Sequence, residues 1–365
     1  MASARGQVLV GMSGGVDSAV AAALLQAQGW DVTGAFVCMG RAAEADAGAS
    51  GCCSPQDAAD ARRVAGLLGV DLFVLDAGRD FERVIDAFAA EYAAGRTPNP
   101  CIGCNRDVKF GRLLRRARDL GFDAVATGHY ARVVQHRGAP ALARARAAGK
   151  DQSYVLFELP RQALGRLVLP LGEVESKAEV RATARRLGLP VHDKPDSQEI
   201  CFVPAGGYVQ YLAERAPETL APGPIVHVDG RVLGEHAGIA GYTVGQRRRL
   251  PASSTGPLYV VALDPATRTV IVGPESALYA RECTVDGLNW VAIPGLAGPL
   301  AVSARIRYNA AAAPAHIEPD ERAGCVSCRF ERGQRAITPG QAAVFYTGDV
   351  VVGGGAISSV VGSCV

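Results

Sequence analysis

The 365-residue sequence has few aromatic residues, very little lysine and no long apolar run. Arginine supplies almost all of the positive charge, and the formal net charge is only +2. So small a net charge does not indicate a surface that is basic throughout, and a nucleic-acid surface would have to be a local patch. No apolar stretch approaches the ~20 residues of a membrane span, and the first residues lack the apolar core of a signal peptide. We therefore expect a cytoplasmic protein without a membrane segment.

Hydrophobic residues make up 48% of the chain and charged residues 20%, which excludes wholesale disorder. From residue 1 to about 205, strand and helix patterns alternate. The expected elements are strands at 72–75 and 124–127 and helices at 56–68, 80–94, 107–120 and 175–187. This alternation predicts an α/β fold with a doubly wound parallel sheet and ligands at the carboxyl ends of its strands.

The composition changes near Pro204, and after a short helical stretch at 208–216 the chain becomes a series of short β segments. Those segments are 225–228, 258–263, 269–272, 302–308, 342–346 and 349–352. Asp229-Gly230 and Asp264-Pro265 are typical hairpin turns. We predict three domains: a catalytic domain at 1–205, a small central β domain at 206–282 and a C-terminal β-barrel at 283–365.

The first of these domains opens with an apolar strand, a turn at 11–18 and an Ala/Leu-rich helix that Gly29 can end. Glycines in the turn let the backbone approach a ligand, and the first N–H groups of a helix attract an anion. The turn lacks the lysine of the P-loop NTPases and instead contains Asp17, a carboxylate able to hold Mg²⁺. The pattern predicts a phosphate cradle. The alternative is an ordinary glycine turn.

Ten cysteines are spaced too unevenly for a secreted disulfide framework. Cys52-Cys53, Cys101/Cys104 and Cys325/Cys328 are close pairs. The Cys-x-x-Cys spacing suits redox chemistry, sulfur transfer or a metal. Zinc held by the two Cys-x-x-Cys pairs is an alternative, although the pairs belong to different expected domains.

Cys101 and Cys104 lie on a segment stiffened by Pro98 and Pro100, which we expect to be a loop just before the helix at 107–120. A thiol near a helix N-terminus has its thiolate favoured by the helix dipole. The alternative is a pair of small buried side chains.

A further cysteine, Cys201, ends a polar and charged stretch that begins at Asp193. Lys194 in that stretch would support a Cys201 thiolate, whereas the neighbouring acidic residues would oppose it.

Ser-Gly-Gly-Val-Asp-Ser after a strand is the signature of the ATP pyrophosphatases, which split ATP between its α and β phosphates. Further motifs follow along the chain, which as a whole resembles the bacterial tRNA-specific 2-thiouridylases. These motifs are Thr97–Pro100 with Cys104-Asn105, Ala126–Tyr130, Lys150–Tyr154, Asp196–Phe202, Tyr242–Arg248, Arg307-Tyr308 and Pro339–Gln341. The resemblance covers nearly the whole chain, and no single motif carries it.

The resemblance implies a tRNA-uridine 2-sulfurtransferase that uses ATP and Mg²⁺. ATP would adenylate the C2 oxygen of the wobble uridine, and sulfur from a protein-bound persulfide would replace that oxygen. The products would be 2-thiouridine, AMP and pyrophosphate. The implied partners are the lysine, glutamate and glutamine tRNAs and a persulfide donor, either a cysteine desulfurase or a relay protein.

The resemblance also implies roles for single residues. Cys201 would carry the persulfide, Cys104 would be the second nucleophile, and the two would close as a disulfide bond after turnover. ATP would contact Gly11, Met12, Ser13, Gly14, Gly15, Val16, Asp17, Ser18, Val37 and Gly128. tRNA would contact Asn99, Pro100, Cys101, His129, Lys150, Asp151, Gln152, Arg307, Tyr308 and Gln341.

At one position the chain departs from a common form of the family, which has Asp where this chain has Cys101. An acid–base role for that Asp is therefore not expected here. In an alternative mechanism Cys101, Cys104 and Cys201 hold a [4Fe–4S] cluster with one iron open to sulfide. A ligase or amidating enzyme with another acceptor, and a non-catalytic RNA-binding protein, are the alternative functions.

We expect clusters of arginines to form the basic patches that contact RNA. Arg112, Arg115 and Arg116 share one helical face, and Arg247–Arg249, Arg305 and Arg307 lie in the β domains. The alternative is that these arginines are ordinary solvated surface.

Overall fold

The computed structural model describes residues 5–40, 54–196, 200–203, 207–254 and 256–361. Cys52, Cys53, Cys364, Ser197–Glu199 and the expected domain boundary at 205/206 lie outside the described residues. The chain divides into two compact units. The first comprises the residues up to Val84, Pro100–Phe202 and Asp349–Val351, and the second comprises Ile85–Asn99, Val203–Gly348 and the residues from Val352 onward.

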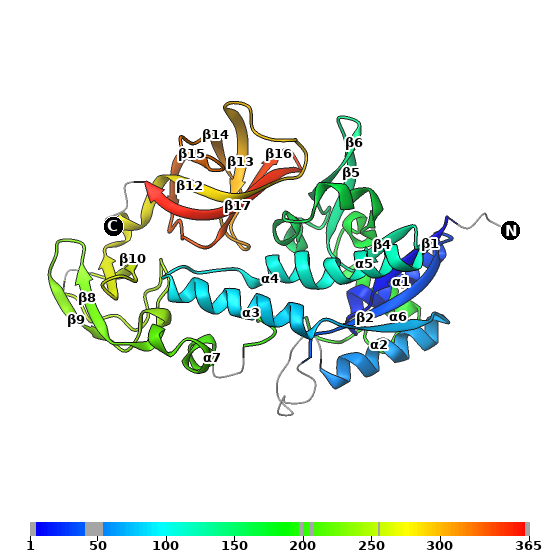
Figure 1. Ribbon diagram of the computed structural model, residues 1–365. Helices are drawn as coiled ribbons and strands as arrows, with labels where there is room; N and C mark the ends of the chain where they lie inside the picture. Colours follow the sequence, from blue (N-terminus) through cyan, green and yellow to red (C-terminus); the bar gives the residue numbers. More distant parts are fainter. Residues whose placement is uncertain (1–4, 41–53, 197–199, 204–206, 255, 362–365) are drawn as a thin grey trace. The chain divides into compact units, whose positions relative to one another are not determined.

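The first unit is built on a parallel five-stranded sheet (Figure 1). In spatial order its strands are β3 (Leu72–Asp76), β2 (Asp31–Cys38), β1 (Gln7–Gly11), β4 (Ala124–Thr127) and β7 (Leu167–Val168). Val8–Val10 of β1 and the whole of β4 are buried, as strands covered on both faces require. The predicted doubly wound α/β sheet is confirmed.

Helices cover both faces of this sheet. On one face Val8 and Val10 of β1 share a core with α1 (Val16–Ala27), α2 (Pro55–Leu68) and α6 (Lys177–Arg186). Side chains alternate along a strand, so Gly11 faces the opposite side, where it lies against Leu113 of α5 (Gly111–Leu120). The turn after β1 therefore emerges between two helical layers.

Local sequence explains where these helices begin. The Ser54 hydroxyl accepts from the Asp57 N–H and the Asp57 carboxylate accepts from the Ser54 N–H, a reciprocal cap that starts α2. Ser176 caps α6 by accepting from the Glu179 N–H. α1 has Gly15 at its N-cap, which has no side chain to cap the first N–H groups.

The segment that carries Cys101 and Cys104 is helical, although the sequence predicted a loop. α4 (Pro100–Gly103), the π-helix η2 (Cys104–Phe110) and α5 follow one another without a break. Proline suits the first helical position, where its missing N–H needs no partner. The prediction of a loop was therefore wrong from Pro100 onward, and Cys104 lies one turn inside the helical stretch.

A hairpin of β5 (Ala131–His136) and β6 (Ala139–Arg144) follows β4 and was not predicted. Its strands are short and their polar residues do not alternate cleanly with apolar ones, which weakens the sequence signal. The other elements of this unit are the short 3-10 helices η3 (Ala148–Lys150), η4 (Ser153–Leu156), η5 (Arg161–Arg166) and η6 (Pro170–Glu173).

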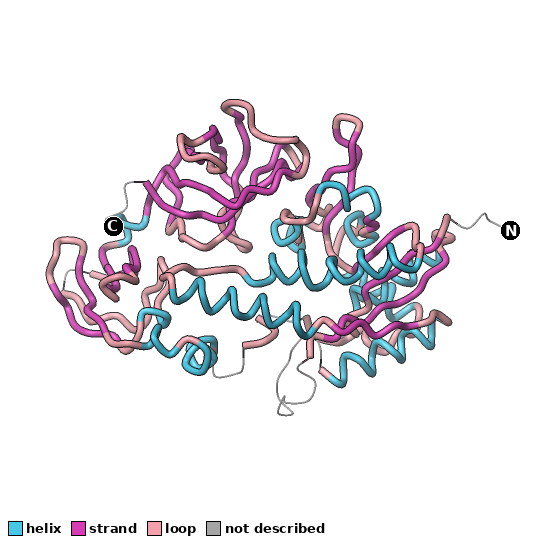
Figure 2. The backbone as a smooth tube through the Cα atoms, viewed as in Figure 1, coloured by secondary structure: helices cyan, strands magenta, loops and turns pink. Residues whose placement is uncertain are grey.

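The second unit contains a four-stranded sheet in the order β10-β11-β8-β9 (Figure 2). Its strands are β8 (Gly223–His227), β9 (Val232–His236), β10 (Tyr259–Asp264) and β11 (Thr269–Gly273). The predicted turns at Asp229 and Asp264 join antiparallel pairs. The helical segments are α7 (Tyr208–Arg215), η7 (Pro217–Leu220), η8 (Ile239–Gly241), η9 (Glu275–Leu278) and the C-terminal part of α3 (Gly78–Ala93).

Six antiparallel strands form a closed C-terminal barrel, because β12 pairs with both β15 and β17. The strands are β12 (Tyr279–Trp290), β13 (Leu300–Arg305), β14 (Ala313–Pro319), β15 (Val326–Arg335), β16 (Ala342–Thr347) and β17 (Val350–Val361). Closure leaves no free sheet edge. The predicted barrel is confirmed, and Cys328 lies in its core directly opposite Cys283.

Within the described ranges, no helix combines the length and the apolar character needed to cross a membrane.

Candidate functional site

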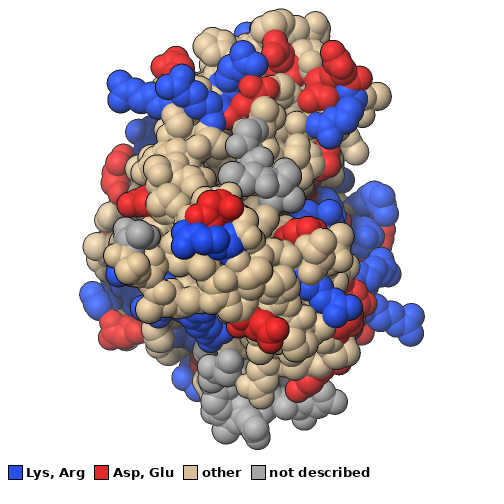
Figure 3. All heavy atoms as spheres, turned by 90° about the vertical axis from the view of Figure 1, so that its left-hand side faces the viewer, with Lys and Arg blue, Asp and Glu red and all other residues tan. Residues whose placement is uncertain are grey.

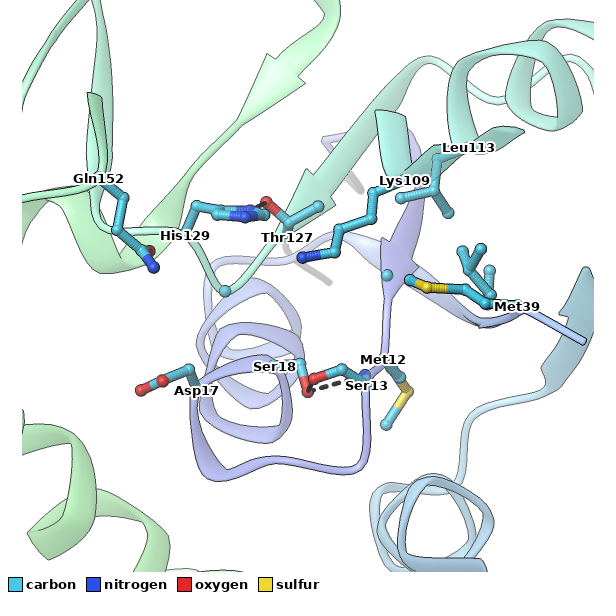
Figure 4. Close-up of a pocket in the computed structure, with 14 residues that line it drawn as sticks. Met12, Ser13, Asp17, Ser18, Met39, Lys109, Leu113, Thr127, His129 and Gln152 are labelled. Atoms are coloured by element: carbon cyan, nitrogen blue, oxygen red, sulfur yellow. Dashed lines mark hydrogen bonds between the residues drawn. The ribbon is translucent and has the colours of Figure 1, made fainter. Parts of the chain in front are cut away.

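A pocket of the first unit opens at the carboxyl ends of β1, β2 and β4 (Figure 4). It is lined by Gly11, Met12, Ser13, Asp17, Ser18, Ala35, Val37, Met39, Lys109, Leu113, Thr127, Gly128, His129 and Gln152. Its volume of about 190 Å³ is more than ten times the ~15 Å³ that one buried water needs. The pocket therefore has room for a ligand, at the point of a doubly wound sheet where ligands bind.

The turn before α1 is held in a tight conformation by its own side chains. Ser18 Oγ donates to the Gly15 carbonyl over 3.1 Å and accepts from the Ser13 N–H over 3.1 Å. Gly14 has φ +74°, and a Cβ there would lie 2.2 Å from the Asp57 carbonyl oxygen. A Cβ on Gly128 would lie 2.6 Å from the Ser18 nitrogen. Only glycine fits at these two positions, so the loop after β4 closely approaches the first turn of α1.

The structure brings together most of the residues that the resemblance assigned to ATP. Those lining the pocket are Gly11, Met12, Ser13, Asp17, Ser18, Val37 and Gly128. Gly14, Gly15 and Val16 form the adjoining turn and the first position of α1. His129 and Gln152, which the resemblance assigned to tRNA, line the same pocket.

Asp17 is held by two residues to which the sequence analysis gave no role. Lys177 Nζ donates to both Asp17 carboxylate oxygens, over 2.9 and 2.7 Å, and the Tyr130 hydroxyl donates to Oδ1 over 2.7 Å. The Lys177 side chain is only 13% exposed. Lys177 lies 160 positions from Asp17 in the sequence, and no local pattern predicts such a pair.

Lys194 holds the turn of the cradle. Its ammonium group donates to Asp57 and Asp60, each over 2.7 Å, and to the Gly14 carbonyl over 3.0 Å. Although burial alone would raise the pKa of Asp60, the hydrogen bond from Lys194 keeps that pKa below its usual range. The charge of Lys194 is therefore matched by two carboxylates beside the turn.

Asp196 precedes the segment that leads to Cys201, and three basic residues surround it. Lys177 lies 2.7 Å, Lys150 2.9 Å and Arg181 3.3 Å from its carboxylate. Partial burial opposes ionisation, but the hydrogen bonds from Lys177 and Lys150 lower the pKa of Asp196 to about 2. Since Lys177 contacts Asp17 as well, one lysine joins the cradle to the start of the Cys201 segment.

Asp151 and Gln152 are used in the fold of the loop after β6. The buried Asp151 carboxylate accepts from the Ala145 and Ser153 N–H groups, both over 3.1 Å. Gln152 Oε1 accepts from the Tyr130 N–H over 2.9 Å. Both side chains therefore hold this loop beside the pocket.

His129 presents a neutral ring to the pocket. Its Nδ1 lies 2.8 Å from Thr127 Oγ1, and its ring packs against Phe110 at a tilt of 34°, with 5.4 Å between centroids. Burial, with Lys109 nearby, lowers the pKa of His129 to about 3. The imidazole therefore offers hydrogen-bonding nitrogens without a positive charge at neutral pH.

The three cysteines of the predicted site belong to the first unit but differ in exposure. Cys101 is exposed in the first turn of α4, Cys104 is buried at the start of η2, and Cys201 is half-buried. Across the part of the chain that the structure describes, no three His, Cys, Asp or Glu side chains are grouped to hold a metal ion.

The basic residues assigned to tRNA in the second unit largely contact the backbone. Arg307 donates to the Val244 carbonyl over 3.3 Å and to Thr338 Oγ1 over 2.7 Å. Arg305 donates to the carbonyl oxygens of Arg307 and Tyr308. These guanidinium groups therefore stabilise the barrel and the loop at Val244.

The other two expected basic patches, Arg112–Arg116 and Arg247–Arg249, differ in their ion pairs and exposure. In the first unit Arg112 and Arg115 share the single carboxylate of Asp80, and Arg116 lies over the Phe73 ring, so that cluster keeps a net positive charge. Arg247–Arg249 are exposed. On the face of the molecule in Figure 3, basic and acidic side chains are interspersed.

We predict that His129→Gln reduces the loss of stability in acid. Between pH 7 and pH 5 an unfolded chain protonates His129, whose ordinary pKa is 6.5, while the folded chain does not. The unfolded state then binds more protons, so stability falls as the pH falls, by about 2 kcal/mol over this range. Urea unfolding at both pH values measures the effect, with the exposed His316→Gln as control. Equal pH dependence in His129→Gln and the unsubstituted protein would contradict a neutral His129.

Three family models match successive parts of the chain. The tRNA methyl transferase HUP domain matches residues 6–205, the tRNA methyl transferase PRC-barrel domain residues 209–274, and the aminomethyltransferase beta-barrel domain residues 280–357. The first match alone spans more than half of the chain.

Curated relatives match along nearly the full length, and three of them are each named tRNA-specific 2-thiouridylase MnmA. The relative from Roseiflexus sp. (strain RS-1) is 47% identical, with 96% of this chain and 99% of the relative covered. Those from Heliobacterium modesticaldum and Moorella thermoacetica are each 49% identical, covering 96% of this chain and 92% and 99% of the relatives. The chain therefore belongs to the tRNA-specific 2-thiouridylase family.

Proposed function

We propose that this protein converts the wobble uridine of tRNA to 2-thiouridine, with ATP as the activating substrate and a Cys201 persulfide as the sulfur source. The observation that carries the proposal is the full-length similarity to relatives named as thiouridylases. The site supports it, because a glycine–serine cradle with Asp17 lies at the carboxyl end of β1 in the unit that also carries Cys104 and Cys201.

Activation of the uridine is the first step. The C2 oxygen is a poor leaving group and must first be activated. It attacks the α-phosphorus of ATP, pyrophosphate departs, and AMP remains bonded to the oxygen. The first N–H groups of α1 would receive the phosphates, and Lys177 would add positive charge beside them. Mg²⁺ is commonly held by one or two carboxylates together with substrate phosphates, and Asp17 would supply the protein's share.

Sulfur transfer is the second step. The Cys104 thiolate attacks Cys201 Sγ, the terminal sulfur leaves as hydrosulfide, and a Cys104–Cys201 disulfide forms. Hydrosulfide adds to C2 and expels AMP, which carries away the original oxygen. An external thiol then reduces the disulfide, and a donor protein of the cysteine desulfurase or relay class reloads Cys201. The substrates are the lysine, glutamate and glutamine tRNAs.

Product analysis distinguishes this reaction from the alternatives. Release of AMP and pyrophosphate that depends on tRNA, with 2-thiouridine in the digested tRNA, is the expected result. A ligase with another acceptor would release both without tRNA, and a binding protein would release neither.

We expect Asp17→Ala to lower AMP formation by about a hundredfold or more, the effect of removing one charged group from a phosphoryl-transfer site. Quantification of AMP by chromatography measures it. Asp71→Ala, which alters an exposed carboxylate in the same unit, should retain normal rates. Normal AMP formation by a folded Asp17→Ala protein would remove Asp17 from the mechanism.

We expect Cys104→Ser and Cys201→Ser each to reduce 2-thiouridine formation to below about 1%, since each removes a sulfur nucleophile. tRNA affinity, measured by fluorescence anisotropy, should stay within about twofold. Cys38→Ser is the matched control, because Cys38 is a half-buried thiol that the mechanism does not use. Wild-type thiolation by either variant would refute the two-cysteine mechanism.

Cys101→Ser tests the persulfide route against a cluster. In the persulfide route Cys101 is a bystander, so the variant should retain at least about half of the thiolation rate. Anaerobic purification with iron and sulfide analysis gives the second measurement. Bound iron that is lost together with activity in Cys101→Ser would make a cluster the sulfur carrier.

A further inference from the structure

Within the second unit, the turn Pro339–Gln341 holds the backbone of Thr97 by two hydrogen bonds. The Thr97 N–H donates to the Pro339 carbonyl over 2.9 Å, and Gln341 Nε2 donates to the Thr97 carbonyl over 2.7 Å. Both backbone polar groups of Thr97 are therefore paired with this one turn. Thr97 immediately precedes the segment Pro98–Pro100, called here the base-recognition loop because the family resemblance implies that its Asn99 contacts the target base of the tRNA.

The turn that holds Thr97 is itself anchored on the barrel. The Gly340 N–H donates to the Ile357 carbonyl, and the Ile357 N–H donates to the Gln341 carbonyl, both over 2.8 Å. Gly340 has φ +88°, and a Cβ there would lie 2.8 Å from the Thr97 nitrogen. The close approach of the two backbones thus depends on glycine at this position.

The residues just before Thr97 are held as well. A Cβ on Gly95 would lie 3.1 Å from Pro265 Cδ, in the hairpin between β10 and β11. Arg96 forms a two-point ion pair with Glu91 of α3, over 2.6 and 2.5 Å. Both β domains therefore contact the segment 95–97, and its position is set before the chain reaches Asn99.

We infer that Gln341 and Gly340 are positioning residues for the base-recognition loop, and that Gln341 acts on the reaction through Thr97 rather than by contact with tRNA. Pro98 and Pro100 have fixed φ angles and restrict the residues before them. The position of Thr97 is therefore transmitted along a stiff chain to Asn99. This inference rests on the proposed function and on the implied contact between Asn99 and the target base.

The test is Gln341→Met, which keeps the length of the side chain and removes its donor. We expect the single-turnover thiolation rate at saturating tRNA to fall about tenfold, the scale of one lost hydrogen bond, with the tRNA Kd within twofold. Amide hydrogen exchange of the peptide containing residues 95–99 should become faster, since Thr97 loses a constraint. Gln334→Met is the matched control, because the Gln334 amide donates to Arg332 on its own strand.

Gly340→Ala disturbs the approach of the turn to Thr97 in a second way, because the added Cβ would lie 2.8 Å from the Thr97 nitrogen. We expect the same fall in rate with an unchanged Kd. Gly348→Ala controls for the cost of a positive φ, since Gly348 has φ +56° and open space around its Cβ position. Should Gly340→Ala fail to fold, Gln341→Met and its exchange measurement decide the question alone.

Two results would overturn the inference. A tRNA Kd raised about tenfold by Gln341→Met, with the rate unchanged, would make Gln341 a direct tRNA contact. An unchanged rate, Kd and exchange would show that the hydrogen bond to Thr97 has no consequence. Failure of the unsubstituted protein to form 2-thiouridine would instead refute the proposed function.

Discussion

The close approach of the loop after β4 to the first turn of α1 is the constraint on which the site depends. Gly128 provides it, because any Cβ would meet the backbone of Asp17 and Ser18. With the two segments this close, the Tyr130 hydroxyl reaches the Asp17 carboxylate, and the His129 ring reaches the same pocket as the cradle. A larger residue would separate the strand end from the helix and open the pocket.

Lysine distribution reinforces this view of the site. The chain has 38 lysines and arginines together, and only four of them are lysine. Lys109 lines the pocket, Lys177 pairs with Asp17, Lys194 holds the Gly14 carbonyl, and Lys150 pairs with Asp196. A compact ammonium group can approach a carbonyl or carboxylate in a confined space where a planar guanidinium needs more room. All four lysines therefore lie at or beside the site.

Several features of the fold could be predicted because they are local. The strand–turn–helix at 7–27 and the turns at Asp229 and Asp264 depend on neighbouring residues, and the structure has them where expected. The helix from Pro100 was missed because proline both disfavours a helix interior and favours its first position. The strands β12, β14 and β15 were missed because pairing around the closed barrel, rather than local composition, makes them strands.

The sequence by itself determined the parallel α/β sheet, the cradle and the order of the cysteine motifs, since each depends on residue spacing within a short segment. Only the tertiary structure decided which charges meet. Asp17 pairs with a lysine 160 positions away, Lys194 with Asp57 and Asp60, and Gln341 with Thr97. Such contacts form between surfaces that packing brings together, and a side chain's own neighbours in the sequence do not reveal its partner.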